Sequence, residues 1–236
     1  MSELYQKFLK FRRKMGLLYW DIVAQLHLAL FRSKRFLTGI FFFLKGLLIR
    51  PDFRPLQHYR YAIICAHPDD ETIFFSRIIK EHKPFVICMS NSGNTRRKKE
   101  FQSALEHWGV EGCMCSIPDV YKRFNGSWKG RRMIRILKKI AAQGKNLECI
   151  YTHNTRGESN HLHHQGLGAS VLKAFPHCNV YMTAEVPETP DPEPNAMYLE
   201  KYEILSTIYD SQCHWLEKSC DWFRGYMSAE QFVKHQ

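Results

Sequence analysis

Two short clusters of metal-binding and acidic side chains stand out in this sequence, and each follows an apolar run. The first, residues 66–71, reads Ala-His-Pro-Asp-Asp-Glu and brings one imidazole and three carboxyl groups together. Carboxylates this close repel one another and take up protons unless a cation or hydrogen-bond donors neutralise them. A divalent metal ion does this, and imidazole and carboxylate are both suitable zinc ligands. The first cluster therefore predicts a metal site.

The second cluster, residues 152–164, reads Thr-His-Asn-Thr-Arg-Gly-Glu-Ser-Asn-His-Leu-His-His and contains four of the twelve histidines. A catalytic zinc has three protein ligands and an open position for water, so this cluster would supply the ligand that the first one lacks. In a helix, His161 and His164 share a face while His163 points elsewhere, so we expect the first two to act together. Magnesium-dependent phosphoryl transfer is the alternative for an acidic cluster. Magnesium prefers oxygen ligands, and the histidines favour zinc.

Alternating apolar and helical stretches from residue 61 onward must position both clusters. We expect strands over 61–66, 85–89, 113–117, 147–152 and 179–184, and helices over 71–80, 96–108, 131–143, 163–175, 196–212 and 214–224. This alternation predicts an α/β fold, a Rossmann-like, largely parallel sheet flanked by helices, with a helical N-terminal extension. In such sheets the reactive groups collect beyond the carboxyl ends of the strands, where both clusters fall. The proline-rich segment 187–194 is expected to be a loop at the rim.

The N-terminal region differs from the rest in charge. Residues 1–60 hold 12 Lys and Arg against three acidic residues, whereas residues 61–236 hold 22 against 20. We expect a basic, apolar helical leader over 1–56 and a catalytic domain over 57–236, with prolines 51 and 55 at the boundary. The apolar segment 36–49 is shorter than the about 20 residues that usually span a bilayer.

The leader mixes aromatic and aliphatic residues with Lys and Arg, as do helices that lie on an anionic membrane surface. We expect membrane contact through residues 1–50; the alternative is packing on the catalytic domain or on a second subunit of a homo-oligomer. The leader has no recognisable nucleic-acid-binding motif, so we do not expect a nucleic-acid partner. The eight cysteines lack paired short spacings and no cleavable leader precedes them, which predicts reduced thiols in a cytoplasmic protein, peripheral at the inner face of the membrane.

The order of these motifs resembles that of the PIG-L/LmbE family of N-acetylglucosaminyl deacetylases. The resemblance rests on residues 66–71, on Arg-Lys-Lys-Glu at 97–100, on the Thr-His, Gly-Glu and His-x-x-His of residues 152–164, and on Tyr-Asp-Ser-Gln at 209–212. It runs from about residue 60 to residue 232 and so covers nearly all of the chain outside the leader.

The resemblance implies a zinc ion held by His67, Asp70 and His164. It also implies that Asp69 is the base that takes a proton from the attacking water. His161 would stabilise the oxyanion or protonate the leaving amine. The implied enzyme is a zinc-dependent hydrolase that removes the N-acetyl group from an N-acetylglucosamine-type amino sugar, carried by a lipid or a nucleotide.

Arg97 and Asn154 are the candidates for substrate contact. By the resemblance, Arg97 would bind a phosphate or hydroxyl group, with Glu100 as its partner within the chain; the alternative is a solvated helix face. Asparagines 91, 94 and 154 follow predicted strands and could line the pocket. Two alternatives for the whole protein stay open: a zinc amidase acting on another acylated amine or a thiol-sugar conjugate, and a catalytically weak, membrane-tethered binding protein of the same fold.

Two features depart from the family pattern. Many members have His-Pro-Asp-His at the second motif, whereas this chain has Leu162 and His163 in the middle. The acidic residue that would orient the catalytic histidine is therefore missing, and Glu158 or a group from another loop would have to replace it. Residues 72–76, Thr-Ile-Phe-Phe-Ser, are bulkier than the small residues usual in the family, which predicts a narrower pocket near the metal.

Overall fold

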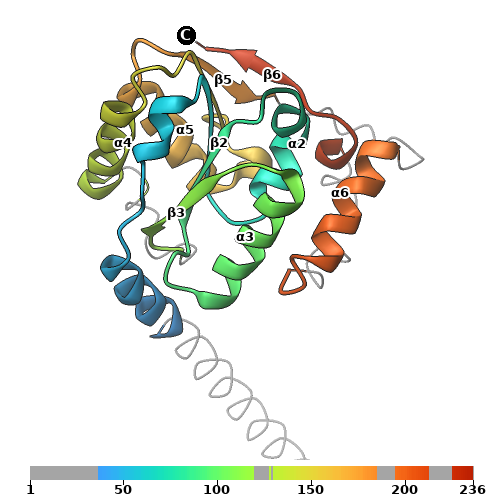
Figure 1. The fold of residues 1–236 in the computed structure, drawn as a ribbon, viewed down its shortest axis with the longest axis horizontal. Helices are drawn as coiled ribbons and strands as arrows, with labels where there is room; N and C mark the ends of the chain where they lie inside the picture. Colours follow the sequence, from blue (N-terminus) through green and yellow to red (C-terminus); the bar gives the residue numbers. More distant parts are fainter. Residues whose placement is uncertain (1–36, 120–127, 129, 185–194, 213–224, 236) are drawn as a thin grey trace, which may run out of the picture. The chain divides into compact units, whose positions relative to one another are not determined.

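The computed structural model describes residues 37–119, 128, 130–184, 195–212 and 225–235 (Figure 1). Six strands form one sheet in the order β3-β2-β1-β4-β5-β6, and the first five are parallel. The strands are β1 (Tyr61–Cys65), β2 (Phe85–Ser90), β3 (Gly112–Ile117), β4 (Cys149–Thr152), β5 (Asn179–Thr183) and β6 (Phe232–Lys234). The predicted α/β fold with a largely parallel sheet is confirmed. The antiparallel β6, paired with β5, was not expected from the sequence.

Helices cover both faces of the sheet, which is why the central strands β1 and β2 are buried apart from Tyr61 at the start of β1. They are α2 (Asp70–His82), α3 (Thr95–Trp108), α4 (Arg131–Gln143), α5 (Leu162–Ala174) and α6 (Ala196–Thr207), with the 3-10 turns η1 (Arg54–His58) and η3 (Glu158–Asn160). α4 and α5 pack with η1 on one core cluster, whereas α2, α3 and α6 pack on the other. α6 ends five residues earlier than expected. The predicted helix 214–224, the loop 187–194 and residues 1–36 of the leader lie outside the described residues.

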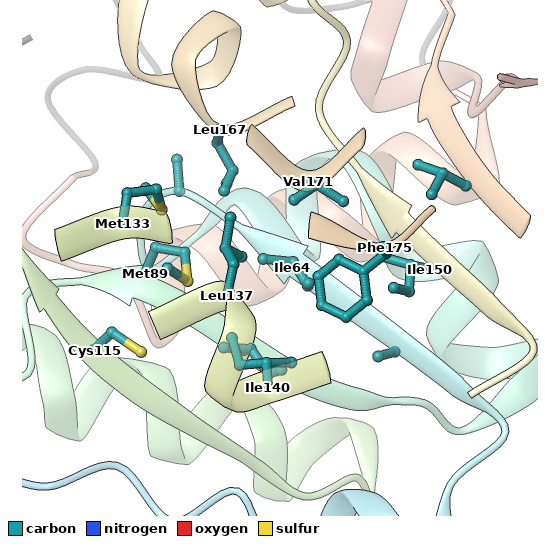
Figure 2. Packing of buried hydrophobic residues seen from close by; sticks show 14 of the residues in the cluster. Ile64, Met89, Cys115, Met133, Leu137, Ile140, Ile150, Leu167, Val171 and Phe175 are labelled. Atoms are coloured by element: carbon teal, nitrogen blue, oxygen red, sulfur yellow. The ribbon is translucent and has the colours of Figure 1, made fainter. Parts of the chain in front are cut away.

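The core beneath α4 follows directly from the spacing of its apolar residues. Met133, Leu137 and Ile140 recur at helical intervals and are fully buried, so one stripe of α4 faces the sheet. Figure 2 shows this stripe meeting Leu167 and Val171 of α5 above the strands. The amphipathic pattern therefore fixes which side of α4 is left to face outward.

A helix over residues 37–48 ends the N-terminal extension, and its last turns contact the domain. A Cβ at Gly93 would lie 1.9 Å from the Phe42 carbonyl oxygen, and a Cβ at Gly46 would lie 2.7 Å from the Cβ of Ser116. Lys45 Nζ also donates to Thr95 Oγ1 at 3.1 Å. Residues 42–46 of the predicted leader therefore pack on the domain, which is one of the two alternatives for the leader. None of the helices in the described residues is both long and apolar enough to cross a bilayer.

A buried ion pair ties α6 to the C-terminal segment and to α2. Lys201 is fully buried, lies 2.7 Å from Glu230 Oε1, and donates to the Ile73 and Tyr226 carbonyl oxygens at 2.7 and 2.9 Å. Ser76 Oγ also donates to Glu230 Oε1, at 2.6 Å. Every donor of the ammonium group has a partner, so removing one charge would leave the other without compensation.

We therefore expect Glu230→Gln to lower the free energy of unfolding by about 3–5 kcal/mol, because it strands the Lys201 charge in the core. The double variant Lys201→Met/Glu230→Gln should recover most of that loss. Glu200→Gln, which breaks the half-exposed pair with Lys80, is the control and should cost less than about 1 kcal/mol. Urea unfolding of the four proteins measures this, and equal losses at positions 200 and 230 would contradict the analysis.

Candidate metal and catalytic site

Both sequence clusters lie where the strand order reverses. The chain runs from β1 outward through β2 and β3, then returns to place β4 on the other side of β1. Residues 66–70 follow β1 and residues 153–161 follow β4, so the two loops meet at the carboxyl ends of neighbouring parallel strands. This switch point is where open α/β sheets bind their ligands.

The first loop is folded around one carboxylate. Asp70 Oδ2 accepts hydrogen bonds from the backbone N–H groups of Ala66 and His67, at 3.1 and 2.7 Å. Asp69, which precedes α2, has a φ of 110°, a conformation that non-glycine residues rarely adopt. Strain of this kind persists where the surrounding structure over-determines it, often at functional sites.

Three donor atoms form a nearly equilateral triangle at this point. His67 Nδ1 and His164 Nε2 each lie 3.5 Å from Asp70 Oδ2, and they lie 3.4 Å from each other. Tetrahedral zinc with bonds of about 2.0–2.1 Å separates its ligand atoms by about 3.3–3.4 Å. The donor set and its spacing therefore fit zinc. His161, whose ring centroid is 4.3 Å from that of His164, also offers a nitrogen to the group.

Glu158 anchors the far side of the histidines. Its Oε2 lies 2.6 Å from His164 Nδ1 and 2.9 Å from His153 Nδ1, and Thr183 Oγ1 donates to its Oε1. Burial would raise the pKa of Glu158, but the two imidazoles hold it well below its usual value. A carboxylate behind a metal-binding histidine fixes the ring orientation and increases its basicity. Glu158 was one of the two candidates to replace the missing acidic residue, and in the structure it contacts His164 and His153.

His153 links the two clusters, a role that the sequence did not indicate. Its Nε2 lies 3.1 Å from Asp70 Oδ2, and the ring is completely buried. Burial would lower its pKa, but the carboxylates of Glu158 and Asp70 outweigh burial and raise the pKa to about 9. Its place in a Thr-His-Asn run directly after a strand was the available signal.

Helical spacing predicted that His163 points away from the site, but the side chain faces it. Its Nδ1 lies 3.0 Å from His67 Nε2, and its ring stacks on Trp128 with centroids 4.6 Å apart. The predicted pairing of His161 with His164 is confirmed. The spacing argument fails only for His163, because His67 reaches both helical histidines, with its Nε2 toward His163 and its Nδ1 toward His164. Asp119 Oδ1 lies 3.5 Å from His67 Nε2. An isolated acid, Asp119 could have been found only from its position just beyond β3.

Asp69 is held by Arg97. The Arg97 guanidinium lies 3.0 Å from Asp69 Oδ2 and 2.8 Å from Glu100 Oε2, and it donates to Ser211 Oγ at 3.2 Å. Glu100 as the intramolecular partner is confirmed. The solvated helix face is wrong, because the side chain of Arg97 is only 9% exposed.

The protonation of Asp69 is set by opposing influences. Burial raises the pKa of its carboxyl group to about 7, the neighbouring carboxylates of Asp70 and Glu71 add to the rise, and the Arg97 charge opposes it. Glu71 is buried too, and Tyr209 Oη donates to its Oε1 at 2.5 Å. A carboxyl group with a pKa near neutrality can both accept and return a proton.

The remaining predicted residues, His161 and Asn154, lie on the second loop. Burial lowers the pKa of His161 to about 2, so its imidazole is neutral at ordinary pH. Asn154 is buried; its Oδ1 accepts from the Arg156 N–H at 2.9 Å and its Nδ2 donates to Thr183 Oγ1 at 3.4 Å. These bonds shape the loop, and its contact with substrate stays a prediction.

Known proteins resemble this chain in sequence. The family described as PIG-L, GlcNAc-PI de-N-acetylase, matches residues 62–175. The N-acetylglucosaminyl-phosphatidylinositol de-N-acetylase of Saccharomyces cerevisiae is 28% identical over 211 residues, which cover 74% of this chain and 69% of the yeast protein. The Bos taurus protein of the same name is 29% identical over 132 residues, 48% of this chain and 49% of its own length. Residues 62–175 of the chain therefore match the PIG-L family, and the resemblance to the PIG-L/LmbE family is confirmed over this part of the chain.

The fold of this protein also occurs among solved structures. An antimicrobial pseudoaglycone deacetylase, Dbv21, matches 69% of this chain and 86% of its own with a TM-score of 0.53 and 14% sequence identity. At that identity the likeness shows the fold alone.

Gly157 lets the second loop of the site close over Glu158. Its φ is +71°, and a Cβ there would lie 2.4 Å from the His161 carbonyl oxygen. Gly109 has a φ of +62°, but a Cβ there would meet only Lys83 Nζ, at 3.9 Å. The two glycines share a backbone conformation and differ in the space around them.

We expect Gly109→Ala to cost about 1–2 kcal/mol of unfolding free energy from backbone conformation alone. Gly157→Ala should cost about 3–4 kcal/mol, because the loop must also move away from His161. Urea unfolding compares the two. Equal losses would mean that the loop adjusts freely and that Gly157 does not fix the site.

Proposed function

We propose that this protein is a zinc-dependent hydrolase that removes the N-acetyl group from an N-acetylglucosamine-type amino sugar. The observation that carries the proposal is the triangle of donor atoms from His67, Asp70 and His164, next to a buried Asp69, in a chain whose residues 62–175 match the PIG-L family. Zinc held by these three residues would polarise the acetyl carbonyl and lower the pKa of the attacking water.

In the proposed reaction Asp69 takes a proton from the attacking water at its carboxylate. Arg97, through its 3.0 Å contact, keeps this carboxylate in place and partly ionised near neutral pH. His161 is neutral, so it would donate a hydrogen bond to the developing oxyanion rather than supply a full proton to the amine. Asp69 would then pass its proton to the leaving nitrogen. The products are acetate and a free amino sugar.

The substrate that we propose is an amino sugar linked to a lipid through a phosphate. The matching family and the yeast and bovine relatives are described as GlcNAc-phosphatidylinositol de-N-acetylases, which supports this class. The basic, apolar leader is consistent with a lipid-linked substrate, and residues 1–50 would contact the membrane. A cytoplasmic protein with this substrate would work at the inner face of that membrane.

The direct test is metal content together with acid release from a panel of acylated glucosamine compounds, including a lipid-linked one. We expect about one zinc per chain in the wild type. Asp69→Asn should keep the metal and lose about 10²–10⁴-fold in kcat for acetate release, because the general base is gone. His164→Ala should lose the metal as well. Asp52→Asn, an exposed carboxylate paired with Arg54, is the control and should behave as wild type.

Each outcome separates the candidates. Release of a different acid, with acetate compounds inert, would point to the amidase alternative. Zinc without any turnover in the wild type would favour the binding protein, and a wild type without zinc would refute the proposed site.

A second test addresses Arg97. Because Asp69 works only when ionised, kcat/KM should fall as the pH drops through the pKa of Asp69. The Arg97 charge lowers that pKa, so Arg97→Met should move the acid limb of the pH profile upward by about one unit or more. Lys99→Met, on the exposed side of α3, is the control. An unchanged acid limb with a raised KM would instead assign Arg97 to substrate binding.

A further inference from the structure

The outward face of α4 is strongly basic. Arg131, Arg135, Lys138 and Lys139 are all exposed, and α4 contains no acidic residue. The opposite face is the apolar stripe that packs on the sheet. The four charges therefore lie together on the side of α4 that faces outward.

Neither ion pairing nor helix stability explains these charges. Among the residues that the structure describes, none of the four cations forms an ion pair with an acidic side chain. Arg131 and Arg132 lie in the first turn, where the helix dipole disfavours positive charge. Four exposed cations with no acidic partner among the described residues, the first of them in an unfavourable position, indicate an anionic partner outside the chain.

The helix over residues 37–48 carries an exposed apolar patch. At the end of the helix over residues 37–48, the side chains of Leu44, Leu47 and Leu48 are 54, 39 and 86% exposed. Single exposed leucines are ordinary, but three within five residues form a patch. Apolar side chains of this kind insert below the headgroups of a bilayer.

Arg132 and Phe43 connect the apolar patch to α4. The Arg132 guanidinium lies over the Phe43 ring, 5.5 Å from its centroid, and donates to Ser116 Oγ at 2.5 Å. Ser116 is the penultimate residue of β3. It comes three positions before Asp119, which lies beside His67. Both helices thus reach Ser116 near the carboxyl end of β3, α4 through Arg132 and the helix over residues 37–48 through Gly46.

We propose that the four cations of α4 and the three leucines form one docking surface for an anionic lipid bilayer. Basic residues alone would suit nucleic acid as well, but nucleic acid offers nothing to bury the leucines against. On the bilayer, the cations lie at the anionic headgroups and the leucines enter the acyl boundary. Presenting a lipid-linked substrate to the site is a consequence that rests on the proposed function, whereas the binding itself does not.

The contribution of the cations is tested by partition of the full-length protein into phosphatidylcholine vesicles with and without phosphatidylserine. Each cation near an anionic surface contributes about fivefold in binding, so Arg135→Gln/Lys138→Gln should weaken partition into the anionic vesicles by about 25-fold. Lys145→Gln/Lys173→Gln removes two exposed charges, one just after α4 and one in the last turn of α5, and it should bind as wild type. Equal weakening in both pairs would overturn the proposal.

The contribution of the leucines is tested with Leu44→Ser/Leu48→Ser, which should weaken partition into the vesicles by about tenfold or more. Leu199→Ser, an equally exposed leucine on α6, is the control and should have no effect. Amide hydrogen exchange with vesicles present should show protection over residues 42–50 and α4. Protection confined to other segments would overturn the proposal, because the leader would then bind without this surface.

Two further measurements distinguish this proposal from nucleic-acid binding and from the proposed function. Wild type that binds a duplex oligonucleotide but not anionic vesicles at the same salt concentration would assign the basic face to nucleic acid. Acetate release from a water-soluble substrate should be unchanged in the α4 and leucine variants. A protein that binds vesicles through this surface but releases no acetate would refute the proposed function and leave the docking surface standing.

Discussion

Several ionisable side chains are crowded and buried at the crossover between β1 and β4, and this constraint shapes the rest of the site. Carboxylates at Asp70 and Glu158 cannot lose water unless donors replace it, and His153 lies between them as the shared partner. The loops that follow the two strands are therefore committed to each other. An exchange of any one of these groups for an apolar residue would leave the others with uncompensated charge.

The acidic residues of the first motif have separate tasks although they are adjacent in sequence. Asp70 faces the histidines, Asp69 faces Arg97, and Glu71 faces Tyr209. The unusual backbone at Asp69 is what allows neighbouring side chains to diverge in this way. The energetic cost of that turn is borne by the packing of α2 and α3 around it, since Phe75, Phe101 and their neighbours are almost fully buried.

The fold and the meeting of the two loops followed from periodicity, because buried parallel strands and amphipathic helices leave strong local patterns. What a local pattern cannot give is the exact start of a helix. Nor can it place a side chain from another loop: His163 faces the site because His67, from the loop after β1, reaches it. Asp119 was missed for another reason, since a single acid after a strand has no partner nearby in the sequence. Its partners, Asn91 and His67, come from other strands and are visible only in three dimensions.

The contact between Gly93 and the helical turn around Gly46 restricts which residues homologues can carry at these two positions. Neither position has room for a side chain, because a Cβ at either one would overlap atoms of the opposing segment or of β3. Relatives that carry a larger residue at one position must hold the preceding helix differently or lack it. The two positions should therefore vary together among homologues, and that joint variation would distinguish members with this N-terminal arrangement from those that have only the catalytic fold.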